Sequence, residues 1–153
     1  MTIRKGDVQD VRFLRDMLVH AFYWRADDAF EAEDPLSRYV KGWGRPGDLA
    51  LVAQEGMNRV GAAWMRLFTA DHPGLGFVDE ETPELAIAVV PARRGHGSGA
   101  ALLEALMERA QHEGFGTISL SVEAASPAVS LYERHGFEKV GENGDSWTML
   151  ARL

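Results

Sequence analysis

The chain has 153 residues, no cysteine and a formal net charge of −7. Its length suits a single domain spanning residues 1–153. The absence of cysteine excludes disulfides, thiolate metal sites and cysteine nucleophiles, and the acidic charge argues against a nucleic-acid partner. No stretch approaches the roughly 18 apolar residues of a membrane span, and no apolar leader follows Met1. We therefore expect a cytoplasmic protein with no membrane partner.

The first half of the sequence predicts a strand, a helix and then a hairpin. The strand lies at Ile3 and Arg4, and Asp7 is a suitable N-cap for the helix. The apolar residues of this helix recur on one face, at Val11, Leu14, Leu18 and Phe22. Residues 23–47 are polar and aromatic, with a short helix expected near 35–40. Residues 49–55 and 59–68 predict an antiparallel hairpin, and 71–83 a loop.

The second half alternates strands and helices. Residues 85–90 form a continuous apolar run, which is typical of a central strand covered on both faces. A helix over 97–113, a strand over 117–122 and a helix over 127–135 follow, and strands over 137–141 and 147–153 close the chain. This order predicts an α/β (α+β) fold with a mixed, mostly antiparallel central sheet flanked by helices.

The most informative segment is the turn Arg94-Gly95-His96-Gly97-Ser98-Gly99, between the apolar strand and the next helix. Glycines let the backbone approach a ligand closely, and the unpaired N–H groups of a helix start attract phosphate. An arginine at the entrance adds a charged, bidentate donor. These features together predict a diphosphate-binding turn, against the simpler alternative of a tight turn that binds nothing.

Three anion-binding motifs compete for this turn. A Walker P-loop requires Gly-Lys-Ser/Thr, but Ala100 and Ala101 follow Gly99. The dinucleotide fingerprint matches as Gly95-x-Gly97-x-x-Ala100, yet it requires its first glycine almost directly after the strand, and here four residues separate Val90 from Gly95. The third pattern, Arg/Gln-x-x-Gly-x-Gly/Ala, is met by Arg94, Gly97 and Gly99.

The turn resembles motif A of the GNAT superfamily of acyl-CoA-dependent N-acetyltransferases. A second segment, Ser126-Pro127-Ala128-Val129-Ser130-Leu131-Tyr132-Glu133-Arg134-His135-Gly136-Phe137, is similar to motif B of that family, Asn-Pro-Ala-x-x-Leu-Tyr-x-x-x-Gly-Phe. The resemblance covers residues 49–153. The sequence departs from motif B at Ser126, where asparagine is usual; serine could contact the cofactor or simply cap the helix.

The resemblance implies acetyl-CoA as co-substrate, no metal, and a set of site residues. Those implied to bind the cofactor are Ile87, Val89, Arg94, Gly95, His96, Gly97, Ser98, Gly99, Ser126 and Tyr132. Within this set, a main-chain N–H of Val89, or of Ile87 in another register, would polarise the thioester carbonyl. Tyr132 would protonate the leaving sulfur, and Glu84 would serve as the base, with Asp79, Glu80 and Glu81 as possible substitutes.

The acceptor implied by the resemblance is an amine, on a small molecule or a peptide, and a homodimer is compatible with the family. Two segments with large aromatics, Trp24-Arg25 and residues 42–48 around Trp43, could wall the acceptor pocket, or the tryptophans could pack on the sheet. The predicted activity is direct transfer of an acetyl group in a ternary complex. The alternative is a non-catalytic acyl-CoA-binding regulatory module of the same fold.

Overall fold

The computed structural model describes residues 1–22 and 35–153, and within them a single seven-stranded sheet. The strands run in the spatial order β1-β2-β3-β4-β5-β7-β6, and every neighbouring pair is antiparallel except β4 and β5. Their bounds are β1 (Thr2–Lys5), β2 (Leu49–Glu55), β3 (Asn58–Arg66), β4 (Glu84–Val89), β5 (Thr117–Glu123), β6 (Glu138–Asn143) and β7 (Ser146–Arg152). The predicted mixed sheet flanked by helices is confirmed.

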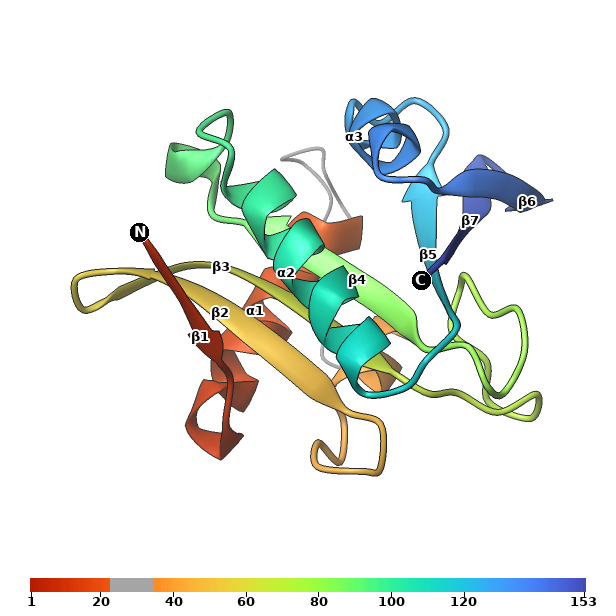
Figure 1. Ribbon diagram of the computed structural model, residues 1–153, viewed down its shortest axis with the longest axis horizontal. Coiled ribbons are helices and arrows are strands. Elements are labelled where there is room, and N and C mark those ends of the chain that lie inside the picture. Colours follow the sequence, from red (N-terminus) through yellow and green to blue (C-terminus); the bar gives the residue numbers. More distant parts are fainter. Residues whose placement is uncertain (23–34) are drawn as a thin grey trace.

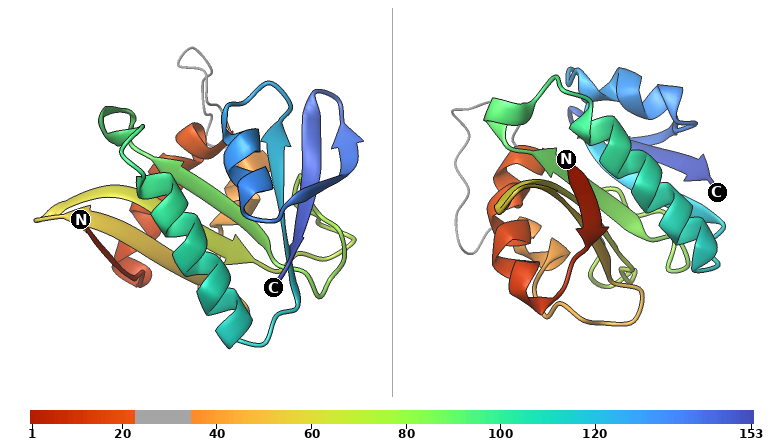
Figure 2. Two further views of the ribbon diagram at one scale, coloured as in Figure 1. Left: turned by 45° about the horizontal axis from the view of Figure 1, so that its top comes forward. Right: turned by 60° about the vertical axis from the view of Figure 1, so that its left-hand side comes forward.

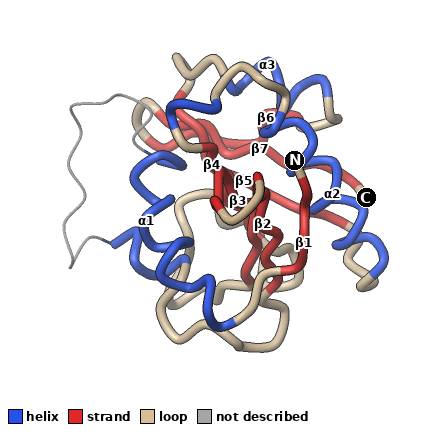
Figure 3. Tube along the Cα trace, turned by 90° about the vertical axis from the view of Figure 1, so that its left-hand side faces the viewer, coloured by secondary structure: helices blue, strands red, loops and turns tan. Residues whose placement is uncertain are grey.

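Helices cover both faces of this sheet (Figures 1 and 2). One face carries α1 (Val11–Phe22) and the short η2 (Pro35–Tyr39), and the opposite face carries α2 (Ser98–His112) and α3 (Ala128–Arg134). Figure 3 shows the strands between α1 and α2. Two further 3-10 turns, η1 (Val8–Asp10) and η3 (Pro91–Arg93), precede α1 and α2. Within the described ranges, no helix has the length and apolarity to cross a membrane.

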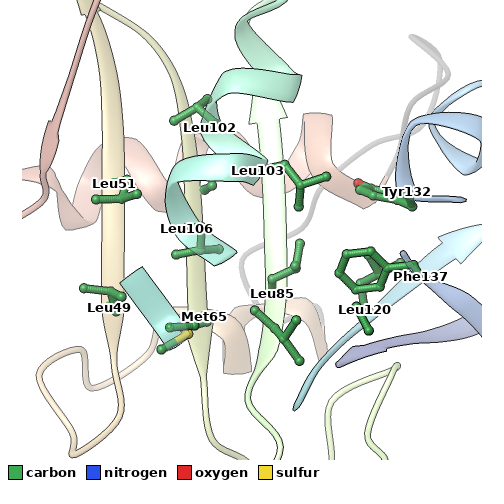
Figure 4. Packing of buried hydrophobic residues seen from close by; sticks show 14 of the residues in the cluster. Leu49, Leu51, Met65, Leu85, Leu102, Leu103, Leu106, Leu120, Tyr132 and Phe137 are labelled. Carbon is green, nitrogen blue, oxygen red and sulfur yellow. The ribbon is translucent and has the colours of Figure 1, made fainter. Parts of the chain in front are cut away.

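Each face of the sheet has its own apolar cluster. Leu14, Leu18 and Trp64 are fully buried on the α1 side, whereas Leu103 and Leu106 are fully buried on the α2 side (Figure 4). Strand β4 contributes to both, because successive side chains of a strand point to opposite faces. Leu85 joins the α2-side cluster, and Ala86 and Ala88 join the α1-side cluster. The prediction of a central strand covered on both faces is confirmed.

The predicted helix start at Asp7 is confirmed, although Asp7 caps the short turn η1 before α1 begins. Its carboxylate accepts the N–H of Gln9, and Asp10 accepts the N–H of Asp7 in return. Asp10 is itself 1% exposed and accepts hydrogen bonds from Arg4 on β1 and Arg59 on β3. The Arg4 guanidinium, more than any other group, holds the pKa of Asp10 well below its usual range.

The sheet is interrupted between β4 and β5. The two strands pair at one position, Glu84 opposite Ser119, where the Ser119 N–H donates to the Pro83 carbonyl at 3.0 Å. Beyond this pair they part, and β5 continues alongside β7 (Figure 1). The edge of β4 that faces β5 is therefore open over most of its length.

Candidate active site

A cavity of about 710 Å³ occupies the opening between β4 and β5. Its lining includes the turn before α2, residues of β4 and β5, and Leu131 and Tyr132 of α3. It also includes residues from the opposite face of the sheet, Phe22 at the end of α1 and Leu36 in η2. The cavity is thus lined from both faces through the gap in the sheet. Another groove of about 770 Å³ lies between β1 and α2 and is lined by none of the predicted site residues.

The predicted phosphate-binding turn lines this cavity with Arg94, Gly95 and Gly97–Gly99, whereas His96 is exposed and lies outside the lining. Gly95 and Gly97 have φ angles of +82° and +80°, a region that favours glycine, and α2 begins at Ser98. Among the described residues, no group accepts a hydrogen bond from the backbone N–H groups of Gly95 to Gly99. Open N–H groups at a helix start suit a diphosphate, so the turn fits that part of coenzyme A.

Arg94 is held at the edge of the cavity by two contacts. Its Nε donates to the Val89 carbonyl at 3.4 Å, and its Nη2 lies 3.3 Å from Nδ1 of His20 on α1. Burial, and then the Arg94 charge, lower the pKa of His20. His20 lines the cavity and was not predicted, because it comes from a helix 74 residues earlier in the sequence. The neighbouring Arg93 is instead paired with Glu55 at 2.6 Å.

The main-chain groups of Ile87 and Val89 face the gap. The Val90 N–H donates to the Val60 carbonyl at 2.8 Å, which makes that position a hydrogen-bonded pair with β3. Hydrogen-bonded and non-bonded pairs alternate along an antiparallel ladder, so residues 85, 87 and 89 direct their N–H and C=O groups away from β3. Both candidates for polarising a thioester carbonyl therefore present main-chain groups to the cavity.

Tyr132 projects from α3 into the space between the two halves of the sheet. Its side chain packs edge-on against Phe137 at 5.8 Å, and its hydroxyl points toward Leu103 of α2 (Figure 4). No described residue hydrogen bonds this hydroxyl, although the tyrosine lines the cavity. Burial raises the pKa of Tyr132 well above its ordinary value.

Glu84 lies behind the cavity wall rather than in the lining. Its side chain is 1% exposed and accepts a hydrogen bond from the hydroxyl of Tyr39 in η2, a residue that the sequence interpretation did not include. Burial raises the pKa of Glu84 to about 7, and the Tyr39 hydrogen bond opposes that rise. Tyr39 also accepts the N–H of Leu75, which does line the cavity.

Ser126 lines the cavity and also performs the capping role that its sequence position predicts. Its hydroxyl accepts the N–H of Ala128 at 3.1 Å, at the start of α3. Asp79, Glu80 and Glu81 lie in an exposed loop outside the lining, where Asp79 and Glu80 accept backbone N–H groups of the same loop.

Of the two segments predicted to wall the acceptor pocket, the structure describes one. Trp24 and Arg25 lie outside the described residues. Trp43 packs on the α1-side cluster with the Arg66 guanidinium 5.2 Å from its ring centroid, and none of residues 42–48 lines the cavity. The packing alternative therefore describes Trp43. In the described ranges, no three acidic or histidine side chains gather as metal ligands would.

Comparison with known proteins identifies the family. The profile of the acetyltransferase (GNAT) family matches residues 11–137. The chain therefore belongs to the GNAT acetyltransferases, a family of transferase enzymes. It is 33% identical over 113 residues to a mycothiol acetyltransferase of Propionibacterium freudenreichii, covering 73% of this chain and 34% of that protein. It is also 34% identical over 109 residues to the Kocuria rhizophila protein of the same name, and this match covers 69% of this chain and 35% of that protein. The chain spans about a third of the length of these relatives.

Solved structures show the same fold over essentially the whole chain. A ribosomal-protein-alanine N-acetyltransferase from Brucella melitensis has a TM-score of 0.75 at 24% identity, with 100% of both chains covered. The putative acetyltransferase yncA from Salmonella typhimurium, solved with acetyl-CoA, has a TM-score of 0.74 at 25% identity and covers 100% of this chain and 94% of its own. These similarities agree with the topology described above.

Proposed function

We propose that this protein transfers an acetyl group from acetyl-CoA to a primary amine by direct attack in a ternary complex. The observation that carries the proposal is the cavity lined from both faces of the sheet through the gap between β4 and β5. Acetyl-CoA would enter between α2 and α3, and the amine would approach from the α1 side. The two substrates could then meet inside the sheet without a covalent acyl-enzyme.

The proposed cofactor site combines backbone N–H groups that have no hydrogen-bond partner among the described residues with side chains at the cavity. The open N–H groups of residues 95–99 would bind the diphosphate, with Arg94 adding charge at the entrance. Ser98 of the same turn and Ser126 before α3 line the cavity, whereas His96 would contact only the part of the cofactor outside it. Main-chain groups of Ile87 and Val89 would pair with the pantetheine arm, and one N–H would polarise the thioester carbonyl.

The amine must lose a proton before it attacks. An alkyl ammonium with a pKa of about 10.4 is neutral in only about one part in a few thousand at pH 7, which costs roughly 4.6 kcal/mol. Glu84, with a pKa of about 7, has a suitable affinity for that proton. Because Glu84 is buried behind the cavity wall, the proton would reach it through ordered water.

Transfer then replaces one bond with another. The amine nitrogen bonds the acetyl carbon, the carbon–sulfur bond breaks, and the sulfur takes the proton of the Tyr132 hydroxyl. The nitrogen releases its remaining extra proton, which restores Tyr132 through solvent. Burial raises the pKa of Tyr132, and a thiolate released into the same cavity is destabilised for the same reason.

The test is release of CoA from acetyl-CoA in the presence of an amine panel that covers small amines, lysine peptides and peptide N-termini. We expect turnover with at least one class, and Tyr132→Phe should lower kcat by about 100-fold with little change in either KM. Phenylalanine keeps the ring contact with Phe137, so thermal stability should be retained. Tight acetyl-CoA binding with no turnover on any amine would instead favour the non-catalytic acyl-CoA-binding module.

A further inference from the structure

The hydroxyl of Tyr39 connects the buried carboxylate to the cavity wall. It donates to Oε2 of Glu84 and accepts the N–H of Leu75 at 2.7 Å. Leu75 has 38% of its side chain exposed and lines the cavity, whereas Tyr39 and Glu84 are each 1% exposed. One phenol thus holds a titratable group and a cavity-lining residue at the same time.

The direction of this hydroxyl is fixed by the packing of its ring. Tyr39 lies between Phe22, with ring centroids 4.7 Å apart, and Phe68, with centroids 5.1 Å apart. Rings packed on two sides cannot swing without opening the α1-side cluster to which Tyr39 belongs. The phenol is therefore preorganised to donate toward Glu84.

The loop that carries Leu75 is fixed independently. A Cβ at Gly76 would lie 2.5 Å from the Leu120 carbonyl carbon, so the loop backbone rests directly on β5. The Ser119 hydroxyl donates to the Gly76 carbonyl at 2.8 Å, and the Arg38 guanidinium donates to the Pro73 carbonyl. A Cβ at Gly74 would overlap Oε1 of Glu84, so the loop also closes over the carboxylate.

The two oxygens of Glu84 have different surroundings. Oε2 has the Tyr39 hydrogen bond, whereas Oε1 is buried and has no hydrogen-bond partner among the described residues. The backbone N–H of Gly76, and then the charge of Arg38 in η2, also lower the pKa of Glu84, each by less than the Tyr39 hydroxyl does. Across the sheet, Arg66 is opposite Glu84 on β3, but its charge is paired with Asp48 at 2.7 Å. On β5, the residue opposite is the neutral Ser119.

We propose that Tyr39 is a positioning residue for Glu84: its hydroxyl binds Oε2 and leaves Oε1 as the oxygen that takes up the proton lost by the amine. The inference rests on the proposed function, in which Glu84 is the base. In that step an ammonium N–H bond breaks and an O–H bond forms on Oε1, through water, while Tyr39 keeps its own proton. The hydrogen bond stabilises the ionised carboxylate, so it lowers the pH at which Glu84 becomes an active base.

Substitution Tyr39→Phe tests this role, because it removes the hydroxyl and keeps the ring contacts with Phe22 and Phe68. Loss of a hydrogen bond to an ionised carboxylate should raise the pKa of that carboxylate by about one unit. We therefore expect the ¹³C carboxyl resonance of Glu84, assigned with Glu84→Gln, to titrate about one unit higher. The acid limb of kcat/KM, measured with one amine throughout, should move by the same amount, and the rate should recover at high pH.

Two further proteins control for fold and loop position. Ser119→Ala removes another side-chain hydrogen bond to the same loop and leaves the Tyr39–Glu84 hydrogen bond in place, so the acid limb of kcat/KM should not move from its wild-type position. Incorporation of 3-fluorotyrosine at position 39 makes the phenol a stronger donor, so it should move the Glu84 titration to lower pH. This second change keeps every hydrogen bond and is informative even where Tyr39→Phe does not fold.

The outcomes separate the inference from the function on which it rests. An unmoved Glu84 titration in Tyr39→Phe, or in the fluorotyrosine protein, would overturn the positioning role. A titration that moves while the acid limb does not would keep the Tyr39–Glu84 coupling and overturn Glu84 as the base. A uniform loss of rate at all pH values, with the limb unmoved, would assign Tyr39 a structural role alone.

Discussion

Arg94 and Arg93 are adjacent arginines with different partners. Arg94 contacts His20 and the Val89 carbonyl at the cavity edge, while Arg93 forms an ion pair with Glu55. The phosphate assignment therefore gives the two side chains unequal roles, although both border the cavity.

Arg94→Ala should raise the KM for acetyl-CoA by roughly 10- to 100-fold, the worth of a charge-assisted hydrogen bond, with the amine KM little changed. Arg93→Ala removes the same charge and is the matched control; its effect on the acetyl-CoA KM should be several-fold smaller. Steady-state kinetics with each substrate varied in turn would check this. Equal effects of the two substitutions would contradict the assigned position of the diphosphate.

The glycine turn could be predicted at the level of single residues, but its surroundings could not. The prediction of a glycine turn between a strand and a helix agrees with the positive φ angles observed at Gly95 and Gly97. His20 and Tyr39 lie 74 and 45 residues from their partners Arg94 and Glu84. No local pattern specifies such a contact, because it depends on how α1 and η2 pack on the sheet. For the same reason, the burial of Glu84 could not be inferred from its sequence position.

Most elements follow from sequence periodicity, with small differences at their ends. The helix predicted over 97–113 is α2 (Ser98–His112), and the strand predicted over 59–68 is β3 (Asn58–Arg66). The turns η1 and η3 were not predicted, because three residues are too few to establish a helical period. The loop predicted over 71–83 was correctly a loop, yet its contact with β5 at Gly76 depends on the tertiary fold.

This contact gives a prediction about the element that closes the gap. In Gly76→Ala the new methyl would meet the backbone of Leu120 and Ser121 at 2.5 to 2.7 Å, so either the loop or β5 must move. Overpacking of this kind should lower the free energy of unfolding by about 1–3 kcal/mol. Gly116→Ala, where no atom lies within 4 Å of the added Cβ, should change it by less than about 0.5 kcal/mol. Urea denaturation of both variants would show whether the difference exists.

At the scale of the whole molecule, Glu84 makes stability depend on pH. Its pKa is raised from 4.5 in the unfolded reference to about 7 by burial, so the unfolded chain ionises first as the pH rises. The contribution of Glu84 to the free energy of unfolding is fully present below pH 4.5 and is lost as the pH rises through 7. The loss amounts to at most about 3–4 kcal/mol, because each unit of pKa change is worth about 1.36 kcal/mol.

Glu84→Gln should remove this dependence, because glutamine does not titrate. The free energy of unfolding of the wild type should fall between pH 4.5 and 7 relative to that of the variant, as measured by urea denaturation. Asp10→Asn is the contrasting control. Because Arg4 lowers the pKa of Asp10, the stabilisation that Asp10 provides is lost only in acid. The decrease in the free energy of unfolding caused by Asp10→Asn should therefore be constant from about pH 5 to 8. Parallel pH curves for the wild type and Glu84→Gln would contradict the raised pKa.

Because β4 and β5 pair at a single position, one side of the central strand β4 behaves like the edge of a sheet. Amide hydrogens of a central strand ordinarily exchange with solvent slowly, since neighbouring strands protect them on both sides. Those of Ile87 and Val89 face the open gap, while those of Ala86 and Ala88 face β3. Exchange along β4 should therefore alternate between fast and slow in the absence of ligand. A bound pantetheine arm would slow the fast set, so that these two amides report directly on occupancy of the gap.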